Sequence, residues 1–368
     1  MGSAYTFMLD LYRQDGRPVG QSLLDPDWTP ALEWLHFEGI REGRLPPLMA
    51  VNLAPGSYQV EPVWHPQCGQ PRVSGFRVTL PANGSGEIAR DIPITYVRGA
   101  AERASAVLVE KGLLQRGDTF QYVVSAFADP PQVRAAQTLT ADFSVEDVVQ
   151  PLPLRESSMA ALLPAEVDSR GKHTAGDVAV FVQQTVVDEA LALAERAGDV
   201  ETGGILVGFL HRDASIPDIF VEVTAQIAAP HTNAATTKLT FTPDTWTAVR
   251  AALALRKRGE LMVGWWHYHP DFCRLRECPE EKRRQCTASS AFFSSEDVAL
   301  HTALFARAYN TALLISDSAA TGLTASLFGW RQGMVAARGF YIIPACRTWQ
   351  PATTQRGAGH RNDAGRRP

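Results

Sequence analysis

The sequence lacks three features that would assign it quickly to a class of protein. None of its apolar runs approaches the 18 or so residues that span a bilayer, so we expect no membrane partner. Its net charge is only -4 at pH 7, which gives no electrostatic reason to expect nucleic acid as a partner. The first residues lack the basic region and long apolar run of a signal peptide. We therefore expect a cytoplasmic protein.

Cysteine is also scarce, with 5 in 368 residues. In a cytoplasmic chain, cysteines are more often thiols or metal ligands than disulfides. Three of them, Cys273, Cys278 and Cys286, lie close together in the sequence. They lack one ligand for a tetrahedral zinc site, which His301, Cys346 or another side chain would have to supply. A structural zinc is therefore one alternative, beside thiols that bind no metal or a disulfide.

The length and composition are typical of a globular protein with two domains, since 45% of the 368 residues are hydrophobic and 20% charged. Residues 1–148 contain short β-like runs separated by Gly, Pro and Asn turns, with one helix-like segment at 96–114. We interpret them as a β-rich domain of unknown function. Residues 149–177 lack sustained periodicity and are predicted to be a linker. The small, polar tail at 346–368 is predicted to be disordered.

Residues 178–345 have longer elements that alternate in type, which predicts an α/β fold with a mixed sheet flanked by helices. Helices are predicted at 184–198, 243–259 and 294–309. Strands are predicted at 178–182, 203–210, 219–227, 260–270, 311–316, 323–330 and 334–343.

One of these strands ends in two histidines, His267 and His269, followed by Pro270. Residues i and i+2 of a strand share one face, with Cα atoms roughly 7 Å apart, so the two imidazoles can converge on one metal ion. Chance is not negligible, because 9 histidines in 368 residues give 9 × 9/368, or about 0.2, accidental pairs of this spacing. The pair alone is therefore a weak indication of a metal site.

A hydrolytic zinc site also needs a third protein ligand and a base near the bound water. Asp297, at the start of a predicted helix, can supply the ligand, although Ser294 and Asp297 by themselves favour a capping box. Glu201, at the start of an apolar strand, can supply the base, although alone it would be interpreted as a solvent-facing turn residue.

Together these segments resemble the JAMM zinc metalloproteases, also called the JAB1/MPN/Mov34 or MPN-plus family. The family motif is a glutamate before a GxLxG-like strand, then HxHP, then SxxD. This chain has its parts in that order: Glu201 with TGGILVG, His267 and His269 with Pro270, and Ser294 with Asp297. The resemblance covers about 178–340 and implies a JAB/MPN domain at 178–345, with the sheet and helices of a cytidine-deaminase-like sandwich.

The resemblance also implies a mechanism. His267, His269 and Asp297 would bind a catalytic Zn²⁺, which lowers the pKa of its bound water from 15.7 towards about 7. Glu201 would accept the proton of that water and pass it to the leaving amine, and Ser294 would stabilise the oxyanion. No side chain is expected to act as a nucleophile.

Family members mostly cleave after the C-terminal glycine of ubiquitin or ubiquitin-like proteins. The expected function is therefore a zinc-dependent isopeptidase or peptidase for a ubiquitin-like protein or its conjugates, in deconjugation or precursor processing. Expected partners include E1- or E2-like conjugation enzymes. Two alternatives are a peptidase for a sulfur carrier or another small amide, and a non-catalytic scaffold subunit; the retained motif residues favour an enzyme.

The chain departs from the family pattern at an insert, 271–290, between the HxHP and SxxD parts of the motif. Positions 270–293 separate the second histidine from the serine, a much longer spacing than the family has. The insert carries the cysteine cluster and interleaved acidic and basic residues. Because both flanks match the motif, we expect a loop beside an intact site.

Overall fold

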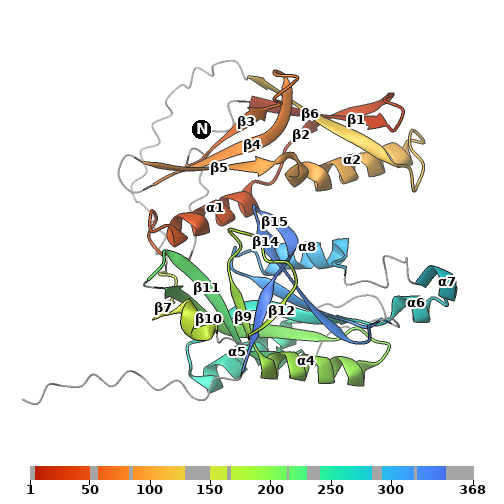
Figure 1. Ribbon diagram of the computed structural model, residues 1–368. Helices are drawn as coiled ribbons and strands as arrows, with labels where there is room; N and C mark the ends of the chain where they lie inside the picture. Colours follow the sequence, from red (N-terminus) through yellow and green to blue (C-terminus); the bar gives the residue numbers. More distant parts are fainter. Residues whose placement is uncertain are drawn as a thin grey trace, which may run out of the picture.

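The computed structural model describes residues 5–49, 57–82, 86–128, 150–163, 167–213, 215–229, 241–283, 292–318 and 321–344. In these ranges the chain forms two sheets (Figure 1). The first packs around one apolar core, and the second has a separate core on each face. The fold is the predicted α/β class with a β-rich amino-terminal region. No helix within the described ranges is long and apolar enough to cross a membrane. The predicted disordered tail, including Cys346, lies outside them.

The amino-terminal region is a six-stranded sheet that packs against two helices. Its order is β2-β1-β6-β4-β3, and β5 pairs with β4. Side chains alternate along β1, so that Phe7, Leu9 and Leu11 are buried in one core with residues of both helices. The strands are β1 (Tyr5–Arg13), β2 (Pro18–Leu24), β3 (Gln59–Trp64), β4 (Arg72–Pro81), β5 (Glu87–Pro93) and β6 (Phe120–Ala128). The helices are α1 (Thr29–Arg41) and α2 (Arg98–Glu110), which follows a 3-10 turn, Ile94–Val97.

The sequence pattern does not predict α1, which lies between the two regions (Figure 1). Leu32 and Leu35 of this helix belong to the amino-terminal core, whereas Phe37 and Ile40 belong to the core of the second region. The ring centroid of Phe37 is 5.9 Å from that of Tyr309. Because α1 is buried on two sides, its apolar residues do not form the single stripe that marks a surface helix.

Polar contacts add to this interface between the regions. Arg41 of α1 forms an ion pair with Asp218 at 2.7 Å, and it donates to the carbonyl of Gly176 at 2.8 Å. Glu33 of α1 pairs with Arg307 at 3.3 Å. Burial raises the pKa of Glu33, although Arg307 opposes that shift. The amino-terminal region is therefore packed onto the second region through both apolar and charged side chains.

The second region is a ten-stranded mixed sheet in the order β15-β14-β13-β12-β10-β11-β9-β16-β8, with β7 paired to β10. Its strands are β7 (Leu154–Ser157), β8 (Asp168–Arg170), β9 (Val180–Gln183), β10 (Gly203–Asp213), β11 (Asp218–Ala228), β12 (Leu261–His269), β13 (Thr311–Ser316), β14 (Thr324–Arg331), β15 (Met334–Arg338) and β16 (Phe340–Ile343). Its helices are α3 (Met159–Leu162), α4 (Gln184–Ala197), α5 (Pro243–Arg256), α6 (Phe272–Leu275), α7 (Glu280–Arg283) and α8 (Ser295–Leu304). The predicted long helices and the strand at 311–316 are confirmed, but the helix predicted at 294–309 ends at Leu304 and the one predicted at 243–259 ends at Arg256.

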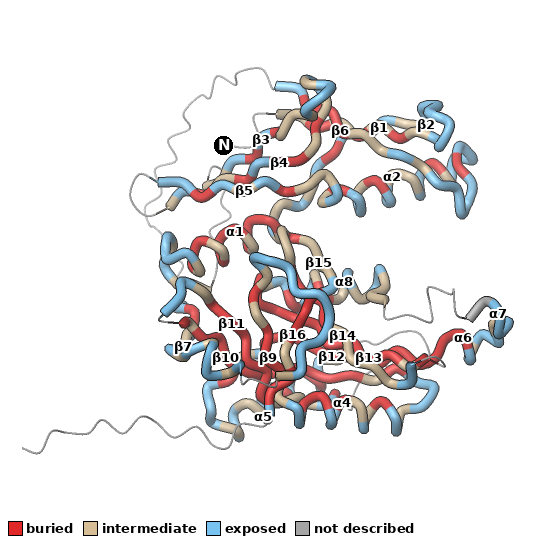
Figure 2. Tube along the Cα trace, in the orientation of Figure 1, coloured by how far each residue is buried: buried red, intermediate tan, exposed pale blue. Residues whose placement is uncertain are grey.

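Alternate residues of β10 enter two different cores, so the sheet is covered on both faces. Leu206 packs in the core that contains α4, and Ile205 packs in the core that contains Val249 of α5. Figure 2 shows that β10, β12 and β13 are buried along most of their length. A strand that is buried on both faces has a nearly continuous run of apolar residues. A polar side chain on such a strand needs a hydrogen-bond partner.

The segment 149–177, predicted to be a linker, contributes two strands to the sheet. Strand β7 pairs with β10 in parallel, and β8 pairs with β16 in antiparallel orientation. All three side chains of β8 are exposed, and those of β7 are exposed or half-buried. Backbone hydrogen bonds therefore hold these strands, and no alternating apolar pattern marks them in the sequence.

The single strand predicted at 334–343 is two strands, β15 and β16, which Gly339 separates. Strand β15 stands at one end of the sheet order, whereas β16 lies near the opposite end. A connection of one residue between such positions requires the sheet to curl until its two ends approach each other. A Cβ atom at Gly339 would lie 2.5 Å from the ring of His173, so any larger residue at this crossing would require His173 to move.

Candidate metal centre

The two histidines of the HxHP segment lie at the end of the central strand β12. In the antiparallel pairing with β10, His267 stands opposite Gly203. On the other side, β12 pairs with β13 in parallel. His267 is 0% exposed and His269 is 5% exposed. Their Nε2 atoms lie 3.0 Å apart, so the two rings converge on one point as the strand geometry predicts.

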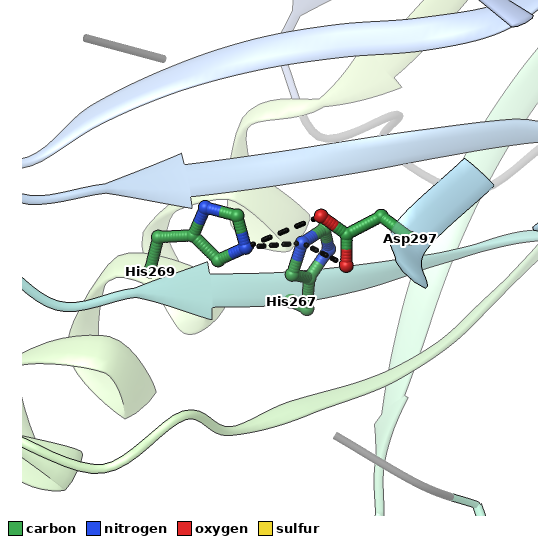
Figure 3. A group of neighbouring side chains, drawn as sticks. All are labelled: His267, His269 and Asp297. Carbon is green, nitrogen blue, oxygen red and sulfur yellow. Dashed lines mark hydrogen bonds and ion pairs between the residues drawn. The ribbon is translucent and has the colours of Figure 1, made fainter. Parts of the chain in front are cut away.

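Asp297 reaches the histidines from the first turn of α8 (Figure 3). Its Oδ1 lies 3.3 Å from Nε2 of His267, and its Oδ2 lies 3.4 Å from Nε2 of His269. The capping box is also present: Ser294 N donates to Asp297 Oδ2 at 2.8 Å, and Asp297 N donates to Ser294 Oγ at 3.1 Å. The two interpretations of the SxxD segment are therefore compatible, because the cap fixes the carboxylate that faces the histidines.

Burial and charge set the protonation of this group. Burial lowers the pKa of His267, outweighing the effect of the hydrogen bond that Asp297 accepts from it, and so favours the neutral imidazole. Burial alone would raise the pKa of Asp297, but its hydrogen bonds to His267 and His269 hold that pKa well below its ordinary value. Asp297 is therefore an anion at neutral pH, which is the form that binds a metal.

Glu201 lies immediately before β10, and the register of that strand locates it. Gly203 pairs with His267, and Tyr268 N donates to the carbonyl of Thr202 at 2.8 Å, which extends the pairing beyond the strand. Continuing this register places Glu201 opposite His269. Residues directly opposite in an antiparallel pair share a face, with Cβ atoms about 4.5 to 5.5 Å apart. Glu201 is only 5% exposed, so it is a buried acid on the same face as the histidines and not a solvent-facing turn residue.

Aromatic rings that the sequence motif does not include surround the two histidines. The ring of His267 stacks on Trp265, with centroids 4.4 Å apart and an interplanar angle of 14°. Phe272 and Phe292 lie 5.5 Å and 5.2 Å from the ring of His269. The sequence did contain an indication of these neighbours. Phe272 lies three residues after His269, and Phe292 and Phe293 directly precede Ser294.

Trp265 is in turn fixed by His301 of α8. The indole Nε1 of Trp265 donates to Nδ1 of His301 at 3.0 Å. Burial lowers the pKa of His301 to about 3, so this imidazole is neutral and can accept the hydrogen bond. His301 therefore has a packing role behind the metal centre, among the aromatic rings of Phe305 and Trp330.

The residues present fit a zinc ion. One ligand atom from each of His267, His269 and Asp297 lies within 4.8 Å of the other two, and this is the only such group of three or more among the residues that the structure describes. Two imidazole nitrogens and a carboxylate oxygen are donor types of catalytic zinc sites, which keep a fourth position for water or substrate. Each Nδ1 of the two histidines is buried without a hydrogen-bond partner in the described part of the chain. The rings therefore make their polar contacts through the two converging Nε2 atoms.

The cysteine cluster is only partly described. Cys273 is 1% exposed and follows the metal centre closely, and Cys278 is half-buried. Cys286 lies outside the described residues, as does the rest of the insert from 284 to 290. A second zinc held by Cys273, Cys278 and Cys286 therefore stays a prediction.

Comparison with known proteins supports the family resemblance. Residues 177–279 match the family described as JAB1/Mov34/MPN/PAD-1 ubiquitin protease. The matched segment contains Glu201, His267 and His269 and ends before Ser294. No curated protein matches the chain. Among solved structures, the chain is similar to protein DSY2949 from Desulfitobacterium hafniense, with 21% identity, 43% of this chain and 89% of that chain covered, and a TM-score of 0.27.

The matched family includes metalloisopeptidases and also members without catalytic activity. The match covers strands β9 to β12 and the helices α4 and α5 between them. It includes both histidines of the HxHP segment. The second region of the chain therefore contains a segment, 177–279, that matches the JAB1/Mov34/MPN/PAD-1 family.

Proposed function

We propose that the protein is a zinc-dependent isopeptidase or peptidase that cleaves after the C-terminal glycine of a ubiquitin-like protein. The observation that supports this most strongly is the convergence of His267, His269 and Asp297 within 4.8 Å in a buried position. Burying ionisable groups costs free energy unless they are paired or bind a metal. Glu201, buried on the same face, adds the acid that a hydrolytic site requires.

The chain's own residues have distinct tasks in this proposal. When bound, zinc supplies an activated water at neutral pH and polarises the carbonyl that is attacked. His267 and His269 would hold the ion through their imidazoles, and Asp297 would hold it through its ionised carboxylate. Glu201 accepts a proton on its carboxylate and returns it to the leaving amine. The burial of these side chains limits access of bulk water to the reacting atoms.

Ser294 has two tasks. Its Oγ accepts the hydrogen bond from Asp297 N, which fixes the third ligand. The hydroxyl hydrogen is not used in that contact and can donate to the developing oxyanion. Oxyanion donors of this kind contribute about 2.7 to 4 kcal/mol where they have been measured. Loss of Ser294 would therefore affect both the position of the ligand and the stabilisation of the transition state.

The substrate class and partners follow from the family. A ubiquitin-like protein or its conjugate is the proposed substrate, in the cytoplasm, and E1- or E2-like enzymes are proposed partners. The amino-terminal region shares a packed interface with the metalloprotease domain through α1. A protein that binds the amino-terminal region would thus be held in a defined place relative to the metal centre.

The test uses zinc-loaded protein and ubiquitin fused through its C-terminal glycine to a reporter, beside small ubiquitin-fold proteins with the same C-terminal residue. We expect release of at least one of them with a free glycine carboxylate, identified by mass spectrometry. Glu201→Gln should retain zinc and lose this activity. Cleavage at another bond, or equal activity of Glu201→Gln, would contradict the proposal. Bound zinc without cleavage of any fusion would instead favour a scaffold subunit.

A further inference from the structure

The two histidines of the metal centre lack the hydrogen bond that usually orients a metal-binding imidazole. A histidine that binds a metal through one ring nitrogen normally donates the N–H of the other to a carboxylate, a carbonyl or water, which fixes the rotation of the ring. The Nε2 atoms of His267 and His269 converge at 3.0 Å, and no group in the described ranges accepts from either buried Nδ1. The rotation of these rings must therefore be fixed by their packing.

For His267 the packing partner is Trp265, two residues earlier on the same face of β12. The two rings stack with centroids 4.4 Å apart and planes at 14°, and both side chains are 0% exposed. Stacked aromatic rings attract each other beyond the area that they bury. A rotation of the imidazole about its Cβ–Cγ bond would break the stack and drive one edge of the ring into the indole. The position of the indole therefore determines the direction in which His267 Nε2 points.

The indole is itself held by a hydrogen bond to α8. Trp265 Nε1, the only polar atom of its side chain, donates to His301 Nδ1 at 3.0 Å, and His301 is 0% exposed. To accept this bond, the neutral imidazole carries its proton on Nε2, and that atom is buried without a partner in the described part of the chain. An unsatisfied buried donor costs free energy, which an apolar ring of similar size would avoid. Histidine at this position therefore indicates a use for the hydrogen bond beyond packing.

Helix α8 also carries the third member of the metal centre. Asp297 lies one turn before His301, so the two side chains lie on one face of the helix. The carboxylate of Asp297 approaches Nε2 of His267 at 3.3 Å. The same helix therefore acts on His267 twice, directly through Asp297 and indirectly through His301 and Trp265.

We propose that His301 is a positioning residue of the metal centre, which holds Trp265 so that the His267 imidazole is oriented toward the same point as Asp297. The inference rests on the proposed zinc site and deepens it, because His301 is assigned a part in metal binding without being a ligand. Replacing the outer partner of a metal ligand lowers metal affinity by about 10- to 100-fold in other proteins. We expect a loss of this size when the hydrogen bond between Trp265 and His301 is removed.

The main test measures zinc affinity by competition with a chromophoric chelator, which requires no turnover. His301→Phe keeps a buried aromatic ring but removes the acceptor, and it should bind zinc about tenfold or more weakly than wild type. His301→Asn returns an acceptor near the position of Nδ1 and should restore most of the affinity. Gln226→Met is the matched control, because Trp266 Nε1, on the same strand, donates to Gln226 Oε1 at 3.1 Å. This control should keep the zinc affinity of the wild type.

A spectroscopic measurement separates positioning from packing. Cobalt(II) bound in place of zinc has visible absorption bands that depend on the arrangement of its ligands. These bands should change in His301→Phe, return in His301→Asn and stay as in wild type in Gln226→Met. A packing role alone would lower the unfolding midpoint of the metal-free His301→Phe protein and leave its zinc affinity and cobalt spectrum unchanged. That result would overturn the inference.

A further variant covers the case in which His301→Phe does not fold. Trp265→Phe keeps a ring beside His267 and removes the donor of the same hydrogen bond, so wild-type zinc affinity in this variant would also overturn the inference. Zinc binding that depends on His301, without cleavage of any ubiquitin fusion, would reject the proposed hydrolytic function and support the positioning role. A wild-type protein that binds no zinc at His267 and His269 would reject both.

Discussion

An ion pair on helix α2 of the amino-terminal region and the candidate metal centre of the second region use polar side chains in opposite ways. In the amino-terminal region, the side chains of the Arg98–Glu102 pair are 73% and 57% exposed. In the second region, the polar groups of the metal centre are almost fully buried, and His267 is 0% exposed. Exposed ion pairs contribute about 0 to 1 kcal/mol and can be lost with little consequence. Burying polar groups costs free energy unless they are hydrogen-bonded or paired. The convergence of several such groups at one place therefore indicates a candidate binding or catalytic site.

The largest effect is expected when two of the proposed metal ligands are removed. His267→Ala with His269→Ala should reduce hydrolysis of a cleavable ubiquitin fusion to the uncatalysed rate, because no other described group offers three converging ligand atoms. The measurement is the initial rate with excess zinc. Arg98→Ala with Glu102→Ala, an equally polar change on the amino-terminal surface, is the control and should retain the wild-type rate. Residual hydrolysis by the histidine variant at a tenth of the wild-type rate would exclude this centre as the site of catalysis.

The next largest effect is expected at Glu201. Glu201→Gln keeps the shape of the side chain but removes the proton acceptor, and general acid–base catalysis contributes about 10² to 10⁴ in rate. The variant should keep the zinc content and unfolding midpoint of the wild type while kcat falls by that factor. The zinc content is the control, because it reports whether the site is intact. A wild-type kcat would show that Glu201 has only a packing role.

A third prediction concerns the contact between the two regions. Phe37 of α1 is 2% exposed and packs against Tyr309, whereas Phe127 of β6 is 49% exposed. Phe37→Ala should lower the free energy of unfolding by about 3 to 5 kcal/mol, as large-to-small changes in cores do. Phe127→Ala should change it by less than about 0.5 kcal/mol. Denaturant titration measures both. Equal effects would mean that α1 is not part of the core of the second region.

The cysteine cluster gives a smaller expected effect. We expect wild type to contain two zinc ions per chain, and Cys278→Ser to contain one, with the insert less protected from proteolysis. Hydrolysis should persist, because the cluster is separate from the catalytic ligands. Zinc content by mass spectrometry and limited proteolysis test this. One zinc per wild-type chain would remove the structural site and leave the catalytic centre unaffected.

The smallest effect is expected for the exposed pair. Glu102→Ala removes the partner of Arg98 four residues earlier on α2, at a distance of 2.9 Å. Such pairs contribute about 0.3 to 0.5 kcal/mol. The variant should therefore unfold within that margin of the wild type and bind the same amount of zinc. A loss of more than about 1 kcal/mol would show that this exposed pair matters for stability and would remove the contrast with the buried metal centre.

The sequence predicted that His267, His269 and Asp297 come together, and the structure brings their ligand atoms within 4.8 Å of one another, whereas their role as zinc ligands stays a prediction. Two histidines at i and i+2 of an apolar strand share a face wherever the strand lies, and Asp297 lies three residues after a helix cap. Glu201 was placed by the family motif, and the strand register supports that position. The aromatic neighbours of the histidines were not predicted, because Phe272 and Phe292 are distant in the sequence and meet only in the folded chain.

The parts of the fold that the sequence did not predict depend on long-range contacts. Helix α1 is buried on two sides and shows no single apolar stripe. Strands β7 and β8 join the sheet through backbone pairing and keep most of their side chains in solvent. The break at Gly339 follows from the curl of the sheet, which brings its ends together. None of these features has a local pattern of its own in the sequence.

The most direct test of the central claim is a count of zinc in wild type and in His267→Ala with His269→Ala, each purified, reloaded with zinc and freed of excess metal. The variant should contain one zinc fewer per chain than wild type, whether or not the cysteine cluster holds a second ion. It should also keep the secondary structure of the wild type, measured by circular dichroism. An equal zinc count in the two folded proteins would contradict the assignment of His267 and His269 as ligands.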